Sequence, residues 1–332
     1  MSSSQDFVEP CVSFSQKLQN SLRIVALIGA GLSTSSGIPT FRGKGSSWRG
    51  FNPSQELSNP YCLQRNPVLF WQYCDWRRYN CIKSSPNAGH FSLARLAFAK
   101  PNFLTISQNI DGLSERAGHD PPSLALIHGS LFDSECCNDS CDYAEYDGLS
   151  DHVIENFNVS HDISDATVTI LPTTLSQLPH CSQCGSLMRP DTVDRIDSWF
   201  DQGPVDLILI VGTSLNVFPA AEYVDRAIER GARVAVFDIE APDRVEDDLQ
   251  FGADHWYFQG DASKTLPEVL KSVIGSDDGQ AMSKNLADND KKIAVHLSTT
   301  PPAFDPTLKS LTPSFPCAGS TDANPPLEKR IL

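Results

Sequence analysis

Short apolar runs that stop at small or polar residues recur along most of this chain. They occupy residues 23–28, 103–106, 207–211 and 233–237, with helical segments between them. Apolar runs of this length are typical of strands that are buried on both faces of a parallel sheet. The pattern therefore predicts an α/β fold with a doubly wound, Rossmann-like parallel sheet. Residues 220–231 are expected to form one crossover helix, with a glycine just past its end.

Two insertions and two terminal segments depart from this pattern. One insertion carries aromatic residues at roughly helical spacing, which predicts a packed helical unit, and the other contains five cysteines and little periodic structure. The last segment is rich in proline, serine, threonine and aspartate, so we expect it to be disordered. We predict an N-terminal extension (1–20), a Rossmann-like domain (21–48, 90–130 and 203–275), a small domain made of a helical insertion (49–89) and a cysteine-rich module (131–190), and a disordered tail (276–332).

The composition is that of a soluble globular protein. The chain has 332 residues, of which 40% are hydrophobic and 20% charged, so apolar residues suffice for a buried core. No apolar stretch approaches the length of about 18 residues that indicates a membrane-spanning helix, and we expect no membrane partner. The N-terminus lacks the basic and apolar regions of a secretion signal. The ten cysteines of the chain are therefore expected to be thiols or metal ligands.

The chain is strongly acidic. Its net charge of −15 disfavours direct binding to nucleic acid and suits a basic polypeptide partner. Between Ala117 and Met188 there is no lysine or arginine, against eleven aspartates and glutamates. This stretch fits either a solvated acidic surface or a docking surface for a basic substrate.

A series of polar and glycine-rich motifs follows the predicted strands. The first, Gly29-Ala30-Gly31, leads into a predicted helix, where glycine lets the backbone approach a pyrophosphate and the helix N-terminus favours its charge. A Gly-x-Gly pattern is weak by itself, but more specific motifs come after it in a fixed order. They are Gly37-Ile-Pro-Thr-Phe-Arg-Gly43, Gln108-Asn-Ile-Asp111, His128-Gly-Ser130 and Gly212-Thr-Ser214.

This ordered set resembles the sirtuins, the NAD-dependent protein-lysine deacylases, over roughly residues 20–270. The resemblance implies NAD as the cofactor and an acyl-lysine protein or peptide, such as a histone or another basic protein, as the substrate. The acyl oxygen attacks the anomeric carbon as nicotinamide leaves. Thr40, where most sirtuins have aspartate, and Trp48-Arg49 resemble class III, which includes desuccinylases and demalonylases.

The resemblance also implies roles for individual residues. His128 matches the general base that activates a ribose hydroxyl, and Asn109 and Asp111 match the residues that position the ribose and nicotinamide. Asn87 and His90 are expected to cap and pack a helix. The implied cofactor contacts are Gly29, Ala30, Gly31, Thr40, Phe41, Arg42, Trp48, Gln108, Asn109, Ile110, Asp111, Gly212, Thr213, Ser214, Asp238 (where the family usually has asparagine), Glu240 and Ala262.

Two cysteine pairs have the spacing of a structural zinc site. Cys181-Ser-Gln-Cys184 is a CxxC knuckle, in which two thiolates can bind one tetrahedral zinc ion. Cys141 is the clear second ligand of the upstream pair, and the first is Cys136 or Cys137. The offset from the predicted catalytic histidine in similar sequences favours Cys136. One zinc ion held by four thiolates would stabilise a small module rather than take part in catalysis.

The acyl-binding segment departs from the class III pattern. Class III sirtuins that remove acidic acyl groups carry a Tyr-x-x-Arg pair, whose arginine pairs with the acyl carboxylate. Arg77 falls at the arginine position and is the candidate substrate contact, but Cys74 stands where the tyrosine belongs. Tyr73 and Trp76 lie nearby and offer partial compensation. The identity of the acyl group therefore stays open: acetyl, malonyl and succinyl groups are all compatible with the sequence.

A second departure follows Pro190. Sirtuins usually continue with a segment like Val-Val-Trp-Phe-Gly-Glu, which lines the acyl-lysine tunnel and pairs with the substrate by strand addition. Here Pro190 runs directly into Asp191, the interval to Gly212 is short, and Trp199-Phe200 is expected in the next helix. A real deletion would leave the NAD and zinc sites intact and weaken peptide binding.

The sequence is therefore compatible with three functions. The leading one is an NAD-dependent lysine deacylase that releases nicotinamide and an O-acyl-ADP-ribose. The alternatives are a catalytically impaired NAD-binding or scaffold protein of the same family, and a protein mono-ADP-ribosyltransferase. The absence of a transit peptide favours nucleus or cytoplasm, with the mitochondrion as the alternative because class III relatives are often mitochondrial.

Overall fold

The computed structural model describes residues 4–40, 47–146, 163–170, 172–191, 196–246 and 254–275. The predicted disordered tail and the predicted cofactor residues Phe41 and Arg42 lie outside these ranges. The helices are α1 (Ser4–Asn20), α2 (Pro60–Arg65), α3 (Pro67–Lys83), α4 (Ala88–Ala99), α5 (Leu113–Arg116), α6 (Asp197–Phe200), α7 (Glu222–Glu229), α8 (Asp243–Glu246) and α9 (Ala262–Ile274), with shorter or irregular turns η1 (Ala30–Ser36), η2 (Pro53–Leu57), η3 (Pro121–Ser123) and η4 (Leu175–Gln177). The strands are β1 (Ile24–Ile28), β2 (Phe103–Ser107), β3 (Leu124–Leu126), β4 (Ser130–Cys136), β5 (Ala144–Tyr146), β6 (Met188–Asp191), β7 (Leu207–Val211), β8 (Arg233–Asp238) and β9 (Trp256–Gln259).

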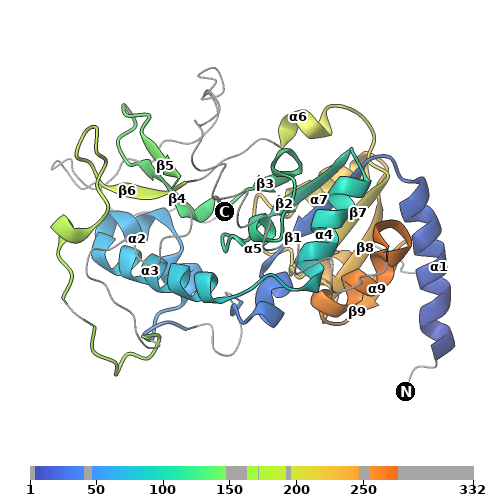
Figure 1. Ribbon diagram of the computed structural model, residues 1–332, viewed down its shortest axis with the longest axis horizontal. Helices are drawn as coiled ribbons and strands as arrows, with labels where there is room; N and C mark the ends of the chain where they lie inside the picture. Colours follow the sequence, from blue (N-terminus) through green and yellow to red (C-terminus); the bar gives the residue numbers. More distant parts are fainter. Residues whose placement is uncertain are drawn as a thin grey trace, which may run out of the picture.

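A six-stranded sheet of order β3-β2-β1-β7-β8-β9 forms the centre of the larger lobe (Figure 1). Every neighbouring pair in it is parallel. The four apolar runs predicted from the sequence are β1, β2, β7 and β8, which confirms the Rossmann-like α/β fold. Strand order reverses between β1 and β7, and ligands of such sheets bind outside the carboxyl ends of the strands at this point.

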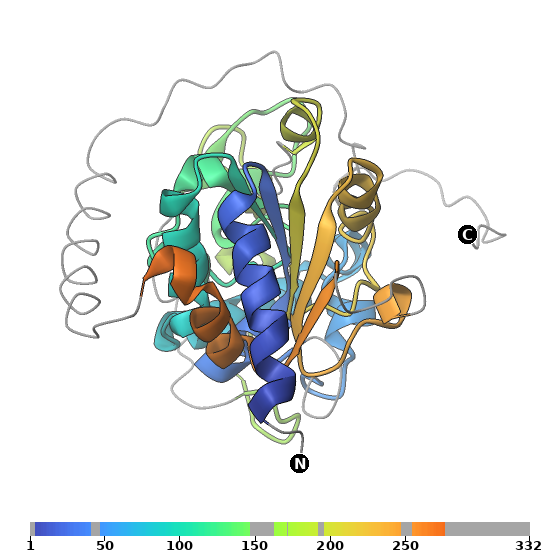
Figure 2. The ribbon, with the colours of Figure 1, turned by 90° about the vertical axis from the view of Figure 1, so that its right-hand side faces the viewer.

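Helices cover both faces of this sheet. Along β1, Ile24, Ala26 and Ile28 pack in one apolar cluster and Val25 and Leu27 in another, because side chains alternate along a strand. The first cluster includes residues of α1, α4 and α9, and the second includes residues of α6 and α7. Figure 2 shows α1 lying across one face of the sheet. The predicted crossover helix is α7, and Gly231 follows its end with φ +93°.

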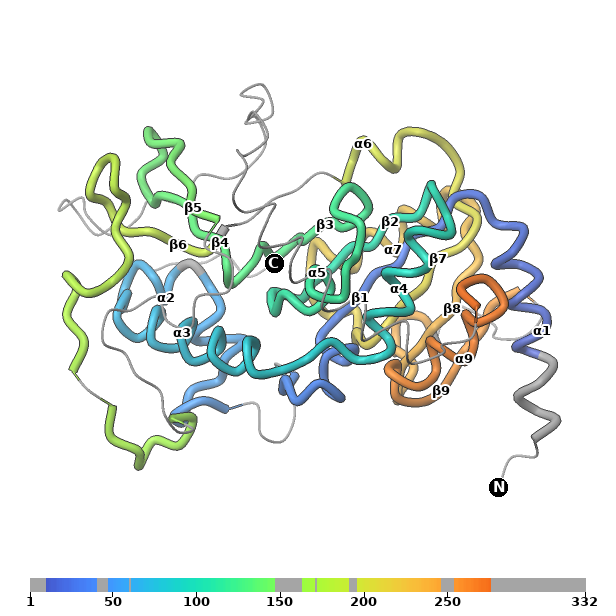
Figure 3. Tube along the Cα trace, in the orientation of Figure 1, coloured from blue at the N-terminus to red at the C-terminus, as the bar shows by residue number. Residues whose placement is uncertain are grey.

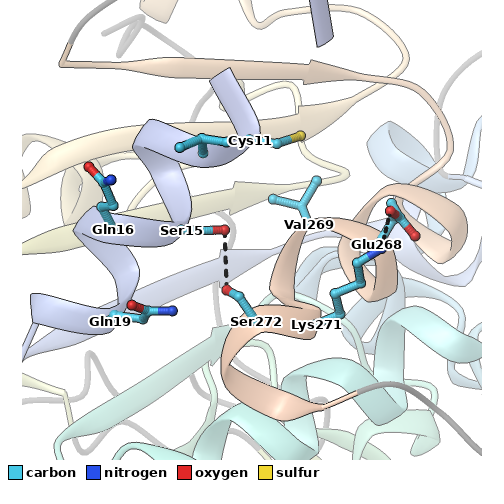
Figure 4. A pocket seen from close by; sticks show the side chains of 9 residues that line it. Cys11, Ser15, Gln16, Gln19, Glu268, Val269, Lys271 and Ser272 are labelled. Atoms are coloured by element: carbon cyan, nitrogen blue, oxygen red, sulfur yellow. Dashed lines mark hydrogen bonds and ion pairs between the residues drawn. The ribbon is translucent and has the colours of Figure 1, made fainter. Parts of the chain in front are cut away.

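The N-terminal helix is part of this core. The fully buried ring of Phe14 packs edge-on against Phe237, Trp256 and Phe258, at centroid distances of 6.0, 5.4 and 5.2 Å. On the outer side, a shallow groove separates α1 from α9, and the hydroxyl of Ser272 donates across it to Ser15 at 3.2 Å (Figure 4). The segment predicted as an extension therefore packs as a layer of the fold.

The two insertions lie together in the smaller lobe (Figure 3). They share one apolar core. This core unites α3 with the antiparallel sheet β5-β4-β6 and includes residues from both insertions. The indole nitrogen of Trp71 donates to the carbonyl of Met188 at 3.2 Å, and Gln72 donates to Thr173 at 3.0 Å. The sequence did not predict this small sheet, because β5 and β6 have only three and four residues and the register of β4 with β6 shifts between Ser130 and Ser134.

The chain returns to the larger lobe at α6. Trp199 and Phe200 lie in this helix, as predicted. The Arg23 guanidinium stacks over the Trp199 ring at 4.2 Å and donates to its carbonyl at 2.6 Å, while Arg230 donates to the Phe200 carbonyl at 2.9 Å. These arginines fix both aromatic residues to the sheet domain. Among the helices that the structure describes, none is long and apolar enough to cross a membrane.

Candidate active site

Two glycine turns meet backbone to backbone where β1 and β7 end. Gly29 donates to the Val211 carbonyl and Gly31 to the Gly212 carbonyl, both at 2.9 Å. A Cβ atom on Gly31 would lie 2.6 Å from the Gly212 Cα, so no side chain fits there. Gly212 has φ +59°, which also favours glycine. The paired turns leave bare backbone at the carboxyl edge of the sheet, which fits the pyrophosphate of NAD.

The motif that follows β2 joins this edge. The side-chain amide of Gln108 donates to the Thr213 hydroxyl at 2.8 Å, and Asn109 donates to the Gly29 carbonyl at 3.0 Å. Residues from the ends of β1, β2 and β7 therefore converge, as the family resemblance implies. Parallel strands place their carboxyl ends at one edge, so segments far apart in the sequence become neighbours there.

Asp111 is buried and held by a hydroxyl. Ser33 donates to one carboxylate oxygen at 2.6 Å, and the backbone N–H of Leu113 donates to the other at 3.0 Å. Ser33 also lies 3.3 Å from Nε2 of His90, whose Nδ1 accepts from the Asn87 backbone at 3.2 Å. That bond assigns the ring proton to Nε2, which donates to Ser33.

His90 therefore has two structural roles. With Asn87 it forms a capping box at the start of α4, where a helix cap was predicted, and it also orients Ser33, which was not among the predicted site residues. Burial lowers the pKa of His90 to about 4, so the ring is neutral at physiological pH. Ser33 lies in η1, two residues after Gly31, but its partners come from α4 and from the segment after β2 and are separated widely in sequence.

His128, the predicted base, is oriented by the main chain. Its Nδ1 lies 3.0 Å from the carbonyl oxygen of Gln108, which assigns the proton to Nδ1 and leaves the lone pair on Nε2. Burial lowers the pKa of His128, while the hydrogen bond to Gln108 raises it by less. The ring is thus neutral and can accept a proton at Nε2.

The remaining predicted cofactor residues differ in exposure. Asp238 at the end of β8 is partly buried, its carboxylate accepts from the Ile239 backbone at 2.7 Å, and burial raises its pKa. Phe237 accepts from Gly212 at 3.0 Å, so Asp238 adjoins the second glycine turn. Ser214 and Glu240 are exposed, Ala30, Thr40 and Ile110 are partly buried, and Ala262 is buried in the core.

Trp48 and Arg77 lie in the smaller lobe. Trp48 is fully buried, and the centroid of its ring lies 5.5 Å from that of the Tyr73 ring. Its contact with the cofactor stays a prediction. Arg77 is 6% exposed and donates to the Tyr73 hydroxyl at 3.2 Å. Tyr73 precedes Arg77 by four residues, one helical turn, so the two side chains share a face of α3. Tyr73, the neighbour of Cys74, is therefore a hydrogen-bond partner of Arg77.

The four predicted zinc ligands form one cluster. The sulfurs of Cys136, Cys141, Cys181 and Cys184 all lie within 4.8 Å of one another. Cys136 and Cys184 are 3.4 Å apart, and Cys141 and Cys181 are 3.7 Å apart. Thiolates bound to one zinc ion at about 2.3 Å in a tetrahedron are separated by about 3.8 Å, so the donor set fits zinc. Cys136, and not Cys137, belongs to the cluster.

The zinc assignment predicts a coupled loss of metal and stability. Replacing Cys181→Ser together with Cys184→Ser should remove about one zinc ion per chain and lower the melting temperature by roughly 5–10 °C, because metal binding contributes to folding. Metal analysis and calorimetry measure both effects. Cys11→Ser, at the partly buried Cys11 of α1, is the control that should keep the zinc. Unchanged zinc in the double variant would contradict the assignment.

Comparisons with known proteins identify the family of this chain. The Sir2 family model matches residues 29–219. An NAD-dependent protein deacylase of Candida albicans is 38% identical over 302 residues, 79% of this chain and 97% of that protein. The mitochondrial NAD-dependent protein deacylase sirtuin-5 of Canis lupus familiaris is 34% identical, over 74% of this chain and 80% of that protein. A Sir2 homologue solved with NAD has a TM-score of 0.60 and 28% identity, over 83% of this chain and 94% of that chain. The chain therefore belongs to the Sir2 family of NAD-dependent protein deacylases.

Proposed function

We propose that this protein removes acyl groups from lysine side chains of proteins, transfers them to ADP-ribose and releases nicotinamide. The observation that carries the proposal is the neutral His128, whose Nδ1 is tied to the carbonyl of Gln108. Asn109 and the buried Asp111 belong to the same motif as Gln108, so the segment that orients the base also carries predicted cofactor contacts. When bound, NAD supplies the electrophilic anomeric carbon and the nicotinamide leaving group.

Residues around the glycine turns bind and orient the cofactor in this proposal. Gly31 and Gly212 expose backbone to the pyrophosphate, and Gln108 and Asn109 lie beside the expected ribose. Ser33 and His90 hold the Asp111 carboxylate in one orientation, which serves the positioning of nicotinamide. Such fixed geometry reduces the entropy lost on reaching the transition state.

His128 acts as the general base. Its unprotonated Nε2 accepts a proton from a ribose hydroxyl, which then becomes nucleophilic toward the transferred acyl group. The Gln108 carbonyl fixes the ring tautomer and stabilises the imidazolium that forms. The imidazolium can then return this proton, as a general acid, to the lysine nitrogen as the amine leaves.

An acidic acyl group is the substrate that the smaller lobe favours. Arg77 is buried, and its guanidinium bonds to the Tyr73 hydroxyl on the same face of α3. A guanidinium can bind a carboxylate through two parallel hydrogen bonds, which an acetyl group cannot use. A malonyl- or succinyl-lysine therefore matches this site better than acetyl-lysine.

The acidic chain suits a histone or another basic protein as the carrier of the lysine. We further propose a nuclear or cytosolic location. The mitochondrion is the alternative, because one relative is named as mitochondrial.

In the direct test, the protein is incubated with acetyl-, malonyl- and succinyl-lysine peptides, with and without NAD. The masses of the products are then measured by mass spectrometry. NAD-dependent loss of one acyl group is expected. His128→Ala should lower turnover by about 10²–10⁴-fold and keep NAD binding, since the ring acts only as a base. A peptide that gains the mass of ADP-ribose would indicate mono-ADP-ribosyl transfer instead. NAD binding without product would support the impaired scaffold, in line with the short segment after Pro190.

The pH dependence follows from the neutral His128. Its pKa lies below the ordinary histidine value of about 6.5, so the base form persists into mildly acidic solution. The acidic limb of kcat/KM should therefore have its midpoint below pH 6.5. A pH profile of kcat/KM, recorded with the acyl-lysine peptide that is least sensitive to acid, measures this. An acidic limb centred above pH 7 would contradict the assigned environment.

Arg77→Lys tests the acyl preference. Lysine keeps the charge but lacks the two-pronged fork, so kcat/KM for succinyl-lysine should fall about tenfold or more relative to acetyl-lysine. Steady-state kinetics with both peptides measure the ratio. The matched control is Arg65→Lys, at an exposed arginine of α2, which should leave the ratio unchanged. Equal losses for both peptides would remove Arg77 from acyl recognition.

A further inference from the structure

Arg116 joins the two lobes of the molecule. It is the last residue of α5, and it donates from Nη1 to the Cys81 carbonyl at 2.9 Å and from Nη2 to the Ser84 carbonyl at 2.7 Å. Both carbonyls lie at the C-terminal end of α3, where the last carbonyl groups of a helix lack their usual backbone partners. Figure 1 shows α5 beside this end of α3. One guanidinium therefore fixes the end of α3, and its positive charge also suits the negative end of the helix dipole.

The other end of α5 is bound to the motif with the predicted cofactor contacts. Leu113, the first residue of α5, donates its backbone N–H to the Asp111 carboxylate at 3.0 Å, and its side chain belongs to the apolar core of the smaller lobe. Gly112 lies between them with φ +70°, and a Cβ atom there would lie 2.8 Å from the Phe132 ring. The turn is therefore closely packed, and α5 leads directly from Asp111 to α3.

The end of α3 that Arg116 fixes is close to the proposed acyl contact. Arg77 precedes Cys81 by four residues, so the two buried side chains share one face of the helix. Burial lowers the pKa of Arg77, but nearby groups, Tyr73 first and Asp111 among them, raise it by more. The charge of Asp111 therefore acts on the Arg77 guanidinium, and the proposed acyl contact and the predicted nicotinamide contact share one environment.

Arg78, the next residue of α3, holds the helix to the small sheet. It is fully buried, donates to the Leu131 carbonyl in β4, and its guanidinium carbon lies 4.9 Å from the centre of the Phe132 ring. The Leu131 backbone N–H donates in turn to the Ile110 carbonyl at 3.1 Å. α3 is thus held at two points, by Arg78 within the helix and by Arg116 at its end.

We propose that Arg116 is a positioning residue for acyl recognition, which sets the position of Arg77 on α3 relative to Asp111 at the cofactor edge. The inference rests on the proposed function, in which Arg77 pairs with the acyl carboxylate. Arg116 donates to helix carbonyls, so it acts through α3. Two parallel hydrogen bonds between a guanidinium and a carboxylate need a defined geometry, so a shift of α3 should weaken binding of succinyl-lysine more than that of acetyl-lysine.

Arg116→Met removes both hydrogen bonds and keeps a long side chain. The affinity of the full chain for a succinyl-lysine peptide, relative to the acetyl-lysine peptide, should fall about fivefold. Isothermal titration with the two peptides measures this ratio without turnover. Arg116→Lys keeps a donor but not the fork, so a smaller fall is expected; it decides the outcome if the methionine variant does not fold. A wild-type ratio in the folded variants would overturn the proposal.

Arg95→Met is the matched control. Arg95 donates to the Ile274 carbonyl in the last turn of α9, so its replacement removes the same kind of bond outside the smaller lobe. Calorimetry should show that both methionine variants lose stability, whereas only Arg116→Met should change the ratio of affinities. An equal change of the ratio in Arg95→Met would mean that general destabilisation causes it, and would exclude the positioning role.

A double-mutant cycle separates this inference from the proposed function. In the Arg77→Lys background, Arg116→Met should lower the ratio by less than about twofold, because the residue through which Arg116 acts is already altered. Two full and independent losses would overturn the positioning role and leave recognition by Arg77 intact. An unchanged ratio in Arg77→Lys alone, or binding of neither peptide, would contradict the proposed acyl recognition itself and this inference with it.

Discussion

The backbone contact between Gly31 and Gly212 is the constraint on which the active site depends. β1 and β7 are neighbouring parallel strands, so the turns that leave them occupy the same edge of the sheet. Any side chain at either glycine would push the turns apart. Their contact lets Thr213 meet Gln108 and lets Asn109 reach Gly29. The glycines thus create both the bare backbone for phosphates and the alignment of the polar residues around it.

Burial then sets the protonation states around this edge. Desolvation disfavours the charged form of an imidazole, and it lowers the pKa of both His90 and His128. The two neutral rings serve different purposes because their hydrogen bonds differ. His90 uses both nitrogens within the fold and orients Ser33, whereas the hydrogen bond of His128 to the Gln108 carbonyl is made by Nδ1. In the proposed function, His128 is the base and His90 a positioning residue, so the same side-chain type serves two purposes.

The smaller lobe depends on contacts between segments that are far apart in the sequence. Its apolar core unites α3 with the β4–β6 sheet, and four cysteine sulfurs from the two ends of the cysteine-rich module come together where one zinc ion would cross-link them. The Arg49 guanidinium donates to the carbonyls of Ala166 and Val168, which ties part of the chain between these ends to the Trp48–Phe51 turn. A short chain segment with few apolar residues can be ordered in this way by a metal and a guanidinium in place of a large core.

The sequence alone determined the parallel sheet, the glycine turns and the cysteine pairs, because each is set by a local pattern of residue types. The domain boundaries and the disordered tail stay predictions. Only the tertiary structure decided between Cys136 and Cys137, paired Tyr73 with Arg77, and placed Ser33 between His90 and Asp111. It also produced the small antiparallel sheet. These features depend on distances between segments that a local pattern does not contain, since chain folding alone sets which side chains meet.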